Sequence, residues 1–180
     1  ARVFSMIASQ MGDTRYRGQI IWMLLTSRPD LLPIDLKRQG RAEVHIPLFY
    51  PHEPTDIQQM LRMMAKKNKV KLGEEAIPTV DPARRLSGAD LESVMLASQR
   101  VAMAAGREVV ERGDLEQALT EFIPSAQGLE KELQEIAAVL ECTQRSFLPP
   151  EWQAKIQKAD GRARLQERMV AIRQLIEEMG

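Results

Sequence analysis

Apolar positions near the start of the chain follow two different patterns. They recur at helical spacing over residues 3–11, up to a Gly-Asp pair that predicts the end of a helix. Residues 20–25 are instead uninterruptedly apolar, and residues 42–48 form a second, mostly apolar stretch. The run 20–25 is typical of a strand buried on both faces of a parallel sheet. The pattern therefore predicts this buried strand and a second short strand over residues 42–48, with a short helical turn over residues 33–38 between them.

From residue 53 onward the apolar period becomes that of a helix and stays so. A first helix runs into the basic stretch 66–69. Ser87, followed three residues later by Asp90, is a capping-box pair that predicts the start of a second helix, and Gly106 is a natural stop for it. A shorter helix is expected to end before Pro124. The expected buried stripe of the second helix is Leu91, Val94, Met95, Val101, Ala102 and Ala105.

The tail of the chain carries two heptad-like seams. Apolar residues step by 4, 3 and 4 in the first seam and by 4, 3, 4 and 3 in the second. Each seam is shorter than the ~3–4 heptads of an independent coiled coil. Two antiparallel helices that pack together or on a neighbour are therefore favoured over a coiled coil. The seams consist of Leu129, Leu133, Ile136 and Leu140, and of Leu165, Met169, Ile172, Ile176 and Met179.

Composition narrows the function classes. The 25 Lys and Arg residues balance 25 Asp and Glu, so no global field attracts nucleic acid or an anionic membrane, and neither is expected as a partner. A single cysteine, Cys142, excludes an intramolecular disulfide and a multi-cysteine zinc site, and two histidines are too few for a His-rich metal centre. The run 20–25 is far shorter than the ~20 residues of a membrane helix, and no signal peptide is visible. We therefore expect a cytoplasmic protein.

Three short motifs carry the candidate chemistry. The strand predicted over residues 20–25 would deliver Thr26 and Ser27 at its carboxyl end, where open α/β sheets bind ligands. About a dozen residues later, Arg38 and Arg41 flank a glycine. Their planar, permanently charged guanidinium groups suit the charge of a transferring phosphoryl group. The third motif, Ser-Gly-Ala-Asp-Leu over residues 87–91, opens a helix.

Together these motifs resemble the AAA family of P-loop ATPases. The segment T-S-R-P-D-L-L over residues 26–32 is similar to the family's T-N-R-P-D-x-L, and K-R-Q-G-R over residues 37–41 is similar to its L-R-P-G-R. The S-G-A-D-L sequence matches the one that opens the sensor-2 helix of the family's lid. Each motif by itself has a simpler interpretation, since Arg28, for instance, could merely pair with Asp30. The joint pattern, in order and at fitting separations, favours the family.

The resemblance implies a fold class and three domains. The fold is an α/β fragment, the end of an AAA+ P-loop nucleotide-binding sheet, followed by a mainly α-helical lid subdomain and a helical tail. The α/β part would occupy residues 1–52, the lid residues 53–125, and the tail residues 126–180, where it could be coiled-coil-like.

The resemblance also implies roles for single residues. Ser27 takes the sensor-1 position, where the family usually has Asn. Arg38 matches the first arginine of its motif, a finger on the nucleotide of the adjacent subunit, and Arg41 matches the second; either could do the work. Gly88 and Ala89 match lid positions near the adenine and ribose. ATP and Mg²⁺ are the implied cofactors, and a ring, expected to be a hexamer, with a protein client or adaptor, is the implied assembly.

Two motifs of such enzymes do not occur in this sequence. It has no G-x-x-x-x-G-K-[ST] loop to cradle phosphates and no apolar strand that ends in Asp-Glu to hold Mg²⁺. In the family both precede the motifs found here, so we expect the C-terminal portion of an ATPase that remodels protein clients, inactive by itself. The absence of H-E-x-x-H argues against a metalloprotease. The alternative is a noncatalytic helical scaffold with degenerate AAA motifs.

Overall fold

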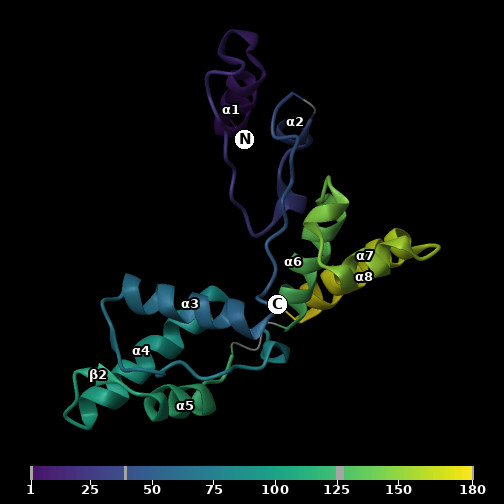
Figure 1. Cartoon of the computed structure of the whole chain (residues 1–180). Coiled ribbons are helices and arrows are strands. Elements are labelled where there is room, and N and C mark those ends of the chain that lie inside the picture. The colour runs from purple at the N-terminus through teal and green to yellow at the C-terminus, as the bar shows by residue number, and fades with distance from the viewer. Residues whose placement is uncertain (1, 39, 125–127, 180) are drawn as a thin grey trace. The chain divides into compact units, whose positions relative to one another are not determined.

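Figure 1 shows a computed structural model that describes residues 2–38, 40–124 and 128–179. The chain is mostly helical and divides into two compact units. One unit is Phe49–Ala126, and the other joins Ala1–Leu48 to Gln127–Gly180. Within the described ranges, no helix has both the length and the apolar character that spanning a bilayer requires.

Three helices build the unit Phe49–Ala126. They are α3 (Pro54–Lys67), α4 (Gly88–Ala104) and α5 (Arg112–Glu121), and α4 packs against both of the others (Figure 1). A small parallel sheet joins β1 (Lys71–Leu72) to β2 (Val109–Val110), with Lys71 opposite Val109. The core lies between the helices, and its fully buried side chains include Leu61, Leu91, Val94, Met95 and Leu115.

Local signals fix both ends of α4, as predicted. The Ser87 Oγ accepts a hydrogen bond from the Asp90 backbone N–H at 3.1 Å, and the Asp90 carboxylate accepts one from the Ser87 N–H at 2.8 Å. This reciprocal pair is the capping box. Gly106 ends the helix with a φ of +74°, where Arg107 donates its N–H to the Ala102 carbonyl at 2.9 Å. The predicted helix start and stop are therefore confirmed.

The predicted buried stripe of α4 is confirmed only in part. Four of its six members are buried, whereas Val101 is half-buried and Ala105 is exposed beyond the last helical turn. Ser98 is buried instead, and its hydroxyl donates to the Met95 carbonyl at 2.7 Å. A serine can take a core position of a helix because this bond satisfies its hydroxyl within the helix itself.

The second unit combines short N-terminal elements with the tail helices. Its N-terminal part holds α1 (Arg2–Gly12) and α2 (Ile34–Lys37), which pack through Met11 and Leu36, and 3-10 turns at Thr14–Tyr16 and Pro29–Leu31. The tail elements are α6 (Gly128–Glu141), a 3-10 turn at Arg145–Phe147, α7 (Pro150–Gln157) and α8 (Gly161–Met179).

Helices α6 and α8 lie side by side in an antiparallel arrangement (Figure 1). Arg162 donates to the Leu140 carbonyl at 2.6 Å near one end, and Arg168 binds Glu132 at 2.8 Å further along. The predicted antiparallel packing of the tail helices is thus confirmed. Ile136 and Ile172 of the two seams are buried, while the Met179 side chain lies outside the described residues.

The two strands predicted over residues 20–25 and 42–48 are not formed, so this part of the α/β prediction is wrong for the described structure. Neither stretch belongs to a sheet, and Ile21, Leu25 and Leu48 are 94%, 81% and 86% exposed. A strand buried on both faces needs strands beside it and cover above and below, which the described residues do not supply. The small sheet described here lies instead in the other unit and escaped prediction because each strand has two residues.

Candidate functional site

The T-S-R-P-D segment folds into a tight turn followed by a single 3-10 turn. The Thr26 Oγ1 accepts a hydrogen bond from the Arg28 N–H at 3.0 Å, which leaves the intervening Ser27 exposed. Arg28 then donates two hydrogen bonds to Asp30, from Nε to Oδ1 at 3.0 Å and from Nη2 to Oδ2 at 2.9 Å. The simpler interpretation of Arg28, an ion pair with Asp30, is therefore confirmed.

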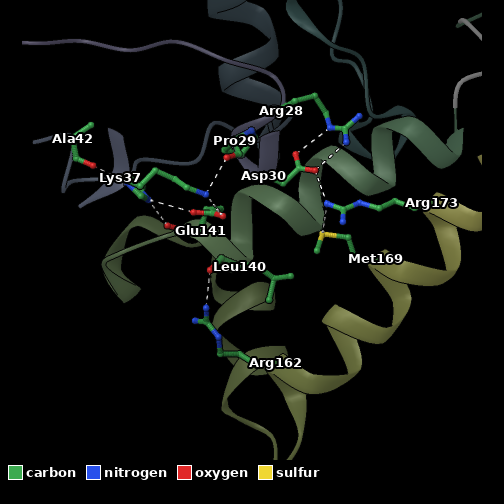
Figure 2. A network of polar contacts seen from close by, with 11 residues as sticks. Arg28, Pro29, Asp30, Lys37, Ala42, Leu140, Glu141, Arg162, Met169 and Arg173 are labelled. Carbon is green, nitrogen blue, oxygen red and sulfur yellow. Dashed lines mark hydrogen bonds and ion pairs between the residues drawn. The ribbon is translucent and has the colours of Figure 1, made fainter. Parts of the chain in front are cut away.

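Asp30 is the most enclosed charged group of this segment, with its side chain 6% exposed. A second guanidinium reaches it from the tail, where Arg173 of α8 donates from Nη2 to Oδ2 at 2.6 Å (Figure 2). The hydrogen bonds from Arg28 first, and then from Arg173, hold the pKa of Asp30 below its usual value against the opposing effect of burial. The bond to Asp30 likewise raises the pKa of Arg28.

A second contact joins the tail to the end of α2. Lys37 donates from Nζ to Glu141 Oε1 at 2.7 Å and to the Pro29 carbonyl at 3.3 Å (Figure 2). Glu141 is the last residue of α6, and its backbone carbonyl lies 2.7 Å from the His45 Nδ1. The His45 Nε2 lies 2.8 Å from the Ala42 carbonyl. His45 is thus a structural histidine, with both ring nitrogens within hydrogen-bond distance of backbone carbonyls.

The two arginines predicted as fingers have different environments. Arg38 follows α2 directly, and its side chain is 68% exposed with Nε 3.5 Å from the carboxylate of Asp35. Arg41 is folded back, since its Nη1 donates to the Asp35 carbonyl at 2.6 Å. A Cβ placed on Gly12 would lie 3.1 Å from the Arg41 Nε, so the guanidinium covers the end of α1 closely. Arg38 is therefore the arginine whose head group can reach outward.

The predicted lid residues lie in the other compact unit. Gly88 is the first residue of α4, and Ala89 follows it within the first turn. A Cβ on Gly88 would come within 3.4 Å of the Met60 Cε and 3.7 Å of the Met64 Cε, so a glycine lets α3 approach the start of α4. Gly88 and Ala89 thus present backbone rather than charge, whereas Ser27, Arg38 and Arg41 belong to the unit with the tail.

Two of the predicted residues offer polar groups at the surface. The guanidinium of Arg38 and the hydroxyl of Ser27 are both exposed and can contact phosphate oxygens. Across the described residues there is no group of three or more His, Cys, Asp or Glu side chains that could hold a metal ion.

Sequence reasoning missed Arg173, Glu141 and the anchoring role of Lys37. Arg173 is separated from Asp30 by 143 positions, and Glu141 is separated from Lys37 by 104. No local spacing or motif marks such pairs in a single sequence. The nearest signal is that Glu141 and Arg173, on helices with apolar seams, carry charges opposite to those of Lys37 and Asp30.

Comparison with known proteins gives a coarse indication of the AAA family. An ATP-dependent zinc metalloprotease FtsH 2 from Symbiobacterium thermophilum is 30% identical over 118 residues, which is 62% of this chain and 19% of that protein. An ATP-dependent zinc metalloprotease FtsH from Mycoplasmoides gallisepticum is 28% identical over 125 residues, 68% of this chain and 16% of that protein. The chain thus spans less than a fifth of the length of these curated relatives. No family model and no solved structure matches the chain.

Proposed function

We propose that this chain is the C-terminal part of an AAA-type ATPase, which couples ATP hydrolysis to remodelling of protein clients in a ring, expected to be a hexamer. Three sequence motifs in the family's order support the proposal, as do the partial matches to two proteins named as ATP-dependent. The zinc and protease parts of those names describe those two proteins and are not carried over.

The observation that carries the proposal is the contrast between Lys37 and Arg38. Lys37 is anchored to the tail through Glu141, whereas the next side chain along is 68% exposed and only loosely paired with Asp35. An exposed ion pair of this kind contributes little stability, so the guanidinium can leave it at low cost. An arginine that reaches the active site of a neighbouring subunit requires a fixed backbone and a side chain that is free to extend, and Lys37 and Arg38 provide these two features.

In the proposed mechanism Arg38 acts in trans. Its guanidinium lies against the γ-phosphate bound by the adjacent subunit and stabilises the negative charge that develops there during transfer. Ser27 acts in its own subunit by donating its hydroxyl to a phosphate oxygen or orienting a water molecule. Arg41 keeps the end of α1 and α2 together through the Asp35 carbonyl, and so it has a structural rather than a catalytic role. Mg²⁺ bound with ATP would neutralise phosphate charge.

The direct test compares Arg38→Ala with Arg41→Ala in the full-length protein. Arg38→Ala should lower ATP turnover by ~10³–10⁵, as loss of an arginine finger does, and leave nucleotide binding intact. Arg41→Ala should lower thermal stability more than Arg38→Ala does, because its guanidinium is the one with close internal contacts. Steady-state kinetics, nucleotide titration and thermal melts give the three readouts. Unchanged turnover of Arg38→Ala would transfer the role to Arg41.

Mixing subunits tests action in trans. Protein carrying Arg38→Ala keeps its own phosphate-binding residues, and a second preparation can be inactivated in those residues while it keeps Arg38. Each is expected to be inactive alone, and a mixture should regain turnover wherever an intact site meets an intact Arg38. No recovery in mixed rings would contradict the trans assignment. A full-length protein that neither binds nor hydrolyses ATP would favour the noncatalytic helical scaffold.

A further inference from the structure

Residues 26–41, called the motif segment below, are contacted by the tail helices at two places. One contact lies before α2 and the other is made by the last residue of α2. Arg173 of α8 binds Asp30 four residues before α2 begins, and Glu141 of α6 binds Lys37, the last residue of α2 (Figure 2). Both contacts are charge-assisted hydrogen bonds shorter than 2.8 Å. The 3-10 turn Pro29–Leu31 also packs directly on α6. The antiparallel α6–α8 pair therefore contacts the segment both before and at the end of the helix that precedes Arg38.

The Asp30 carboxylate already has a cationic partner within its own segment, so the bond from α8 is an additional one. Arg28 already gives the Asp30 carboxylate two hydrogen bonds, at 3.0 and 2.9 Å. Arg173 adds a third bond, from Nη2 to Oδ2 at 2.6 Å, and the residue that donates it lies 143 positions away on α8. The effect of this bond is to connect α8 to the motif segment.

Helix α2 depends on such ties for its orientation. It has four residues, too few for a helix to be stable on propensity alone. Its last residue, Lys37, is held by Glu141 and by the Pro29 carbonyl, and Arg38 follows at the C-cap. Leu36 of α2 also packs on α1, so the tail contacts and this packing together set the direction in which the Arg38 side chain leaves the backbone.

We propose that the α6–α8 pair is a positioning clamp for the Arg38 segment, with Arg173 and Glu141 as positioning residues for the proposed ATPase reaction. This role rests on the proposed function. Neither residue touches the nucleotide; they act through Asp30 and Lys37 by fixing α2. Catalysis by an arginine finger depends steeply on placement, and a misplacement of about 1 Å can lower a rate by ~10²-fold. Any partner that shifts the tail helices would therefore change turnover without contacting the nucleotide.

The test compares Arg173→Gln with Arg168→Gln in the full-length protein. Both arginines lie on α8 and bind a carboxylate, but the carboxylate that Arg168 binds belongs to Glu132 of α6, whereas Arg173 binds Asp30. Coupling through a shared element typically changes energies enough for roughly 2- to 30-fold effects. Arg173→Gln should thus lower kcat for ATP about tenfold with KM within about twofold, and Arg168→Gln should leave both near wild type. Glu141→Gln should resemble Arg173→Gln.

Two further measurements separate positioning from general damage. In an Arg38→Ala background, Arg173→Gln should have no additional effect on turnover, because the group that it positions is already gone. Amide hydrogen exchange at Leu31 and Leu36, whose N–H groups bond to Arg28 and Pro33, should accelerate in Arg173→Gln and not in Arg168→Gln.

The outcomes are distinguishable. If Arg173→Gln matches Arg168→Gln in both kcat and exchange, the clamp is overturned. The same holds if the loss of turnover persists undiminished in the Arg38→Ala background. If the wild-type protein neither binds nor hydrolyses ATP, the proposed function fails first and the positioning role fails with it. In that case, exchange at Leu31 still reports whether the tail holds the segment.

Discussion

The two compact units use their apolar residues in contrasting ways. In Phe49–Ala126 the side chains of Leu61, Leu91 and Met95 are fully buried between three helices. In the other unit, Ile21 and Leu25 are 94% and 81% exposed although they lie in the most apolar run of the chain. A helix satisfies its own backbone and needs only one face covered, whereas a buried strand needs partners on every side. The helical unit therefore completes its core from a short stretch of sequence, and the apolar runs do not.

The largest expected effect is on hydrogen exchange. Backbone amides of residues 20–25 should exchange almost as in an unfolded chain, since these residues lie in no helix or sheet. Amides in the middle of α4 should be protected at least about a thousandfold more, because they open only when the unit unfolds. Exchange mass spectrometry of the 180-residue chain measures both. Better protection of residues 20–25 than of α4 would reverse the comparison.

A matched pair of leucine truncations comes next. Leu91→Ala removes a fully buried side chain from the core and should lower the free energy of unfolding of its unit by about 2–5 kcal/mol. Leu25→Ala makes the same chemical change at an 81% exposed position and should alter stability by less than about 0.5 kcal/mol. Urea unfolding followed by circular dichroism gives both values. Similar losses at the two sites would show that Leu25 is covered in solution.

The stability of the unit Phe49–Ala126 should vary with pH through the ionisation of Asp114. Two hydrogen bonds from Arg107, each 2.7 Å long, lower the pKa of this carboxyl group below its ordinary value. The stability that it contributes is therefore present above the pKa of the unfolded chain, about 3.9, and is lost as pH falls through the lower folded pKa. Asp114→Asn should cost about 1–2 kcal/mol at pH 7, because it weakens the bonds from Arg107 and from the Glu111 N–H, which the Asp114 carboxylate accepts at 2.8 Å. In thermal melts, the difference in melting temperature between Asp114→Asn and the wild type should shrink as the pH falls from 7 to 2.

The smallest expected effect concerns the start of α4. Ser87→Ala removes the hydroxyl that accepts the Asp90 N–H and should cost about 1 kcal/mol. Ser87→Gly should cost only a few tenths of that, since glycine is tolerated at the N-cap. Thermal melts of the two variants supply the comparison. Equal losses in both would indicate that the hydroxyl is not the stabilising group.

Helices were predictable because their signals are local. The capping box of Ser87 and Asp90, the left-handed Gly106 and the seam residues Ile136 and Ile172 act within one or two helical turns of the chain. The strand predictions were wrong over residues 20–25 and 42–48. An apolar run indicates that a segment favours burial, but it does not specify which other elements would cover it.

The candidate site could be predicted only as far as its motifs. Arg38 and Arg41 have equal standing in the sequence, since both flank the same glycine. Their environments separate them, because Arg41 folds against Asp35 and Gly12 while Arg38 extends outward. The order of residues along the chain does not contain that distinction, which depends on how α1 and α2 pack.

The amino-acid sequence alone determined where α4 begins and ends and which motifs the chain carries, since both follow from side chains a few positions apart. Only the tertiary structure decided that Arg173 meets Asp30 and that Glu141 meets Lys37. Such pairs form when packed helices bring distant residues together. Closing the long stretch of chain between them costs entropy, which the packing of the helices offsets. Neither the pairing nor the packing can be read from residues a few positions apart.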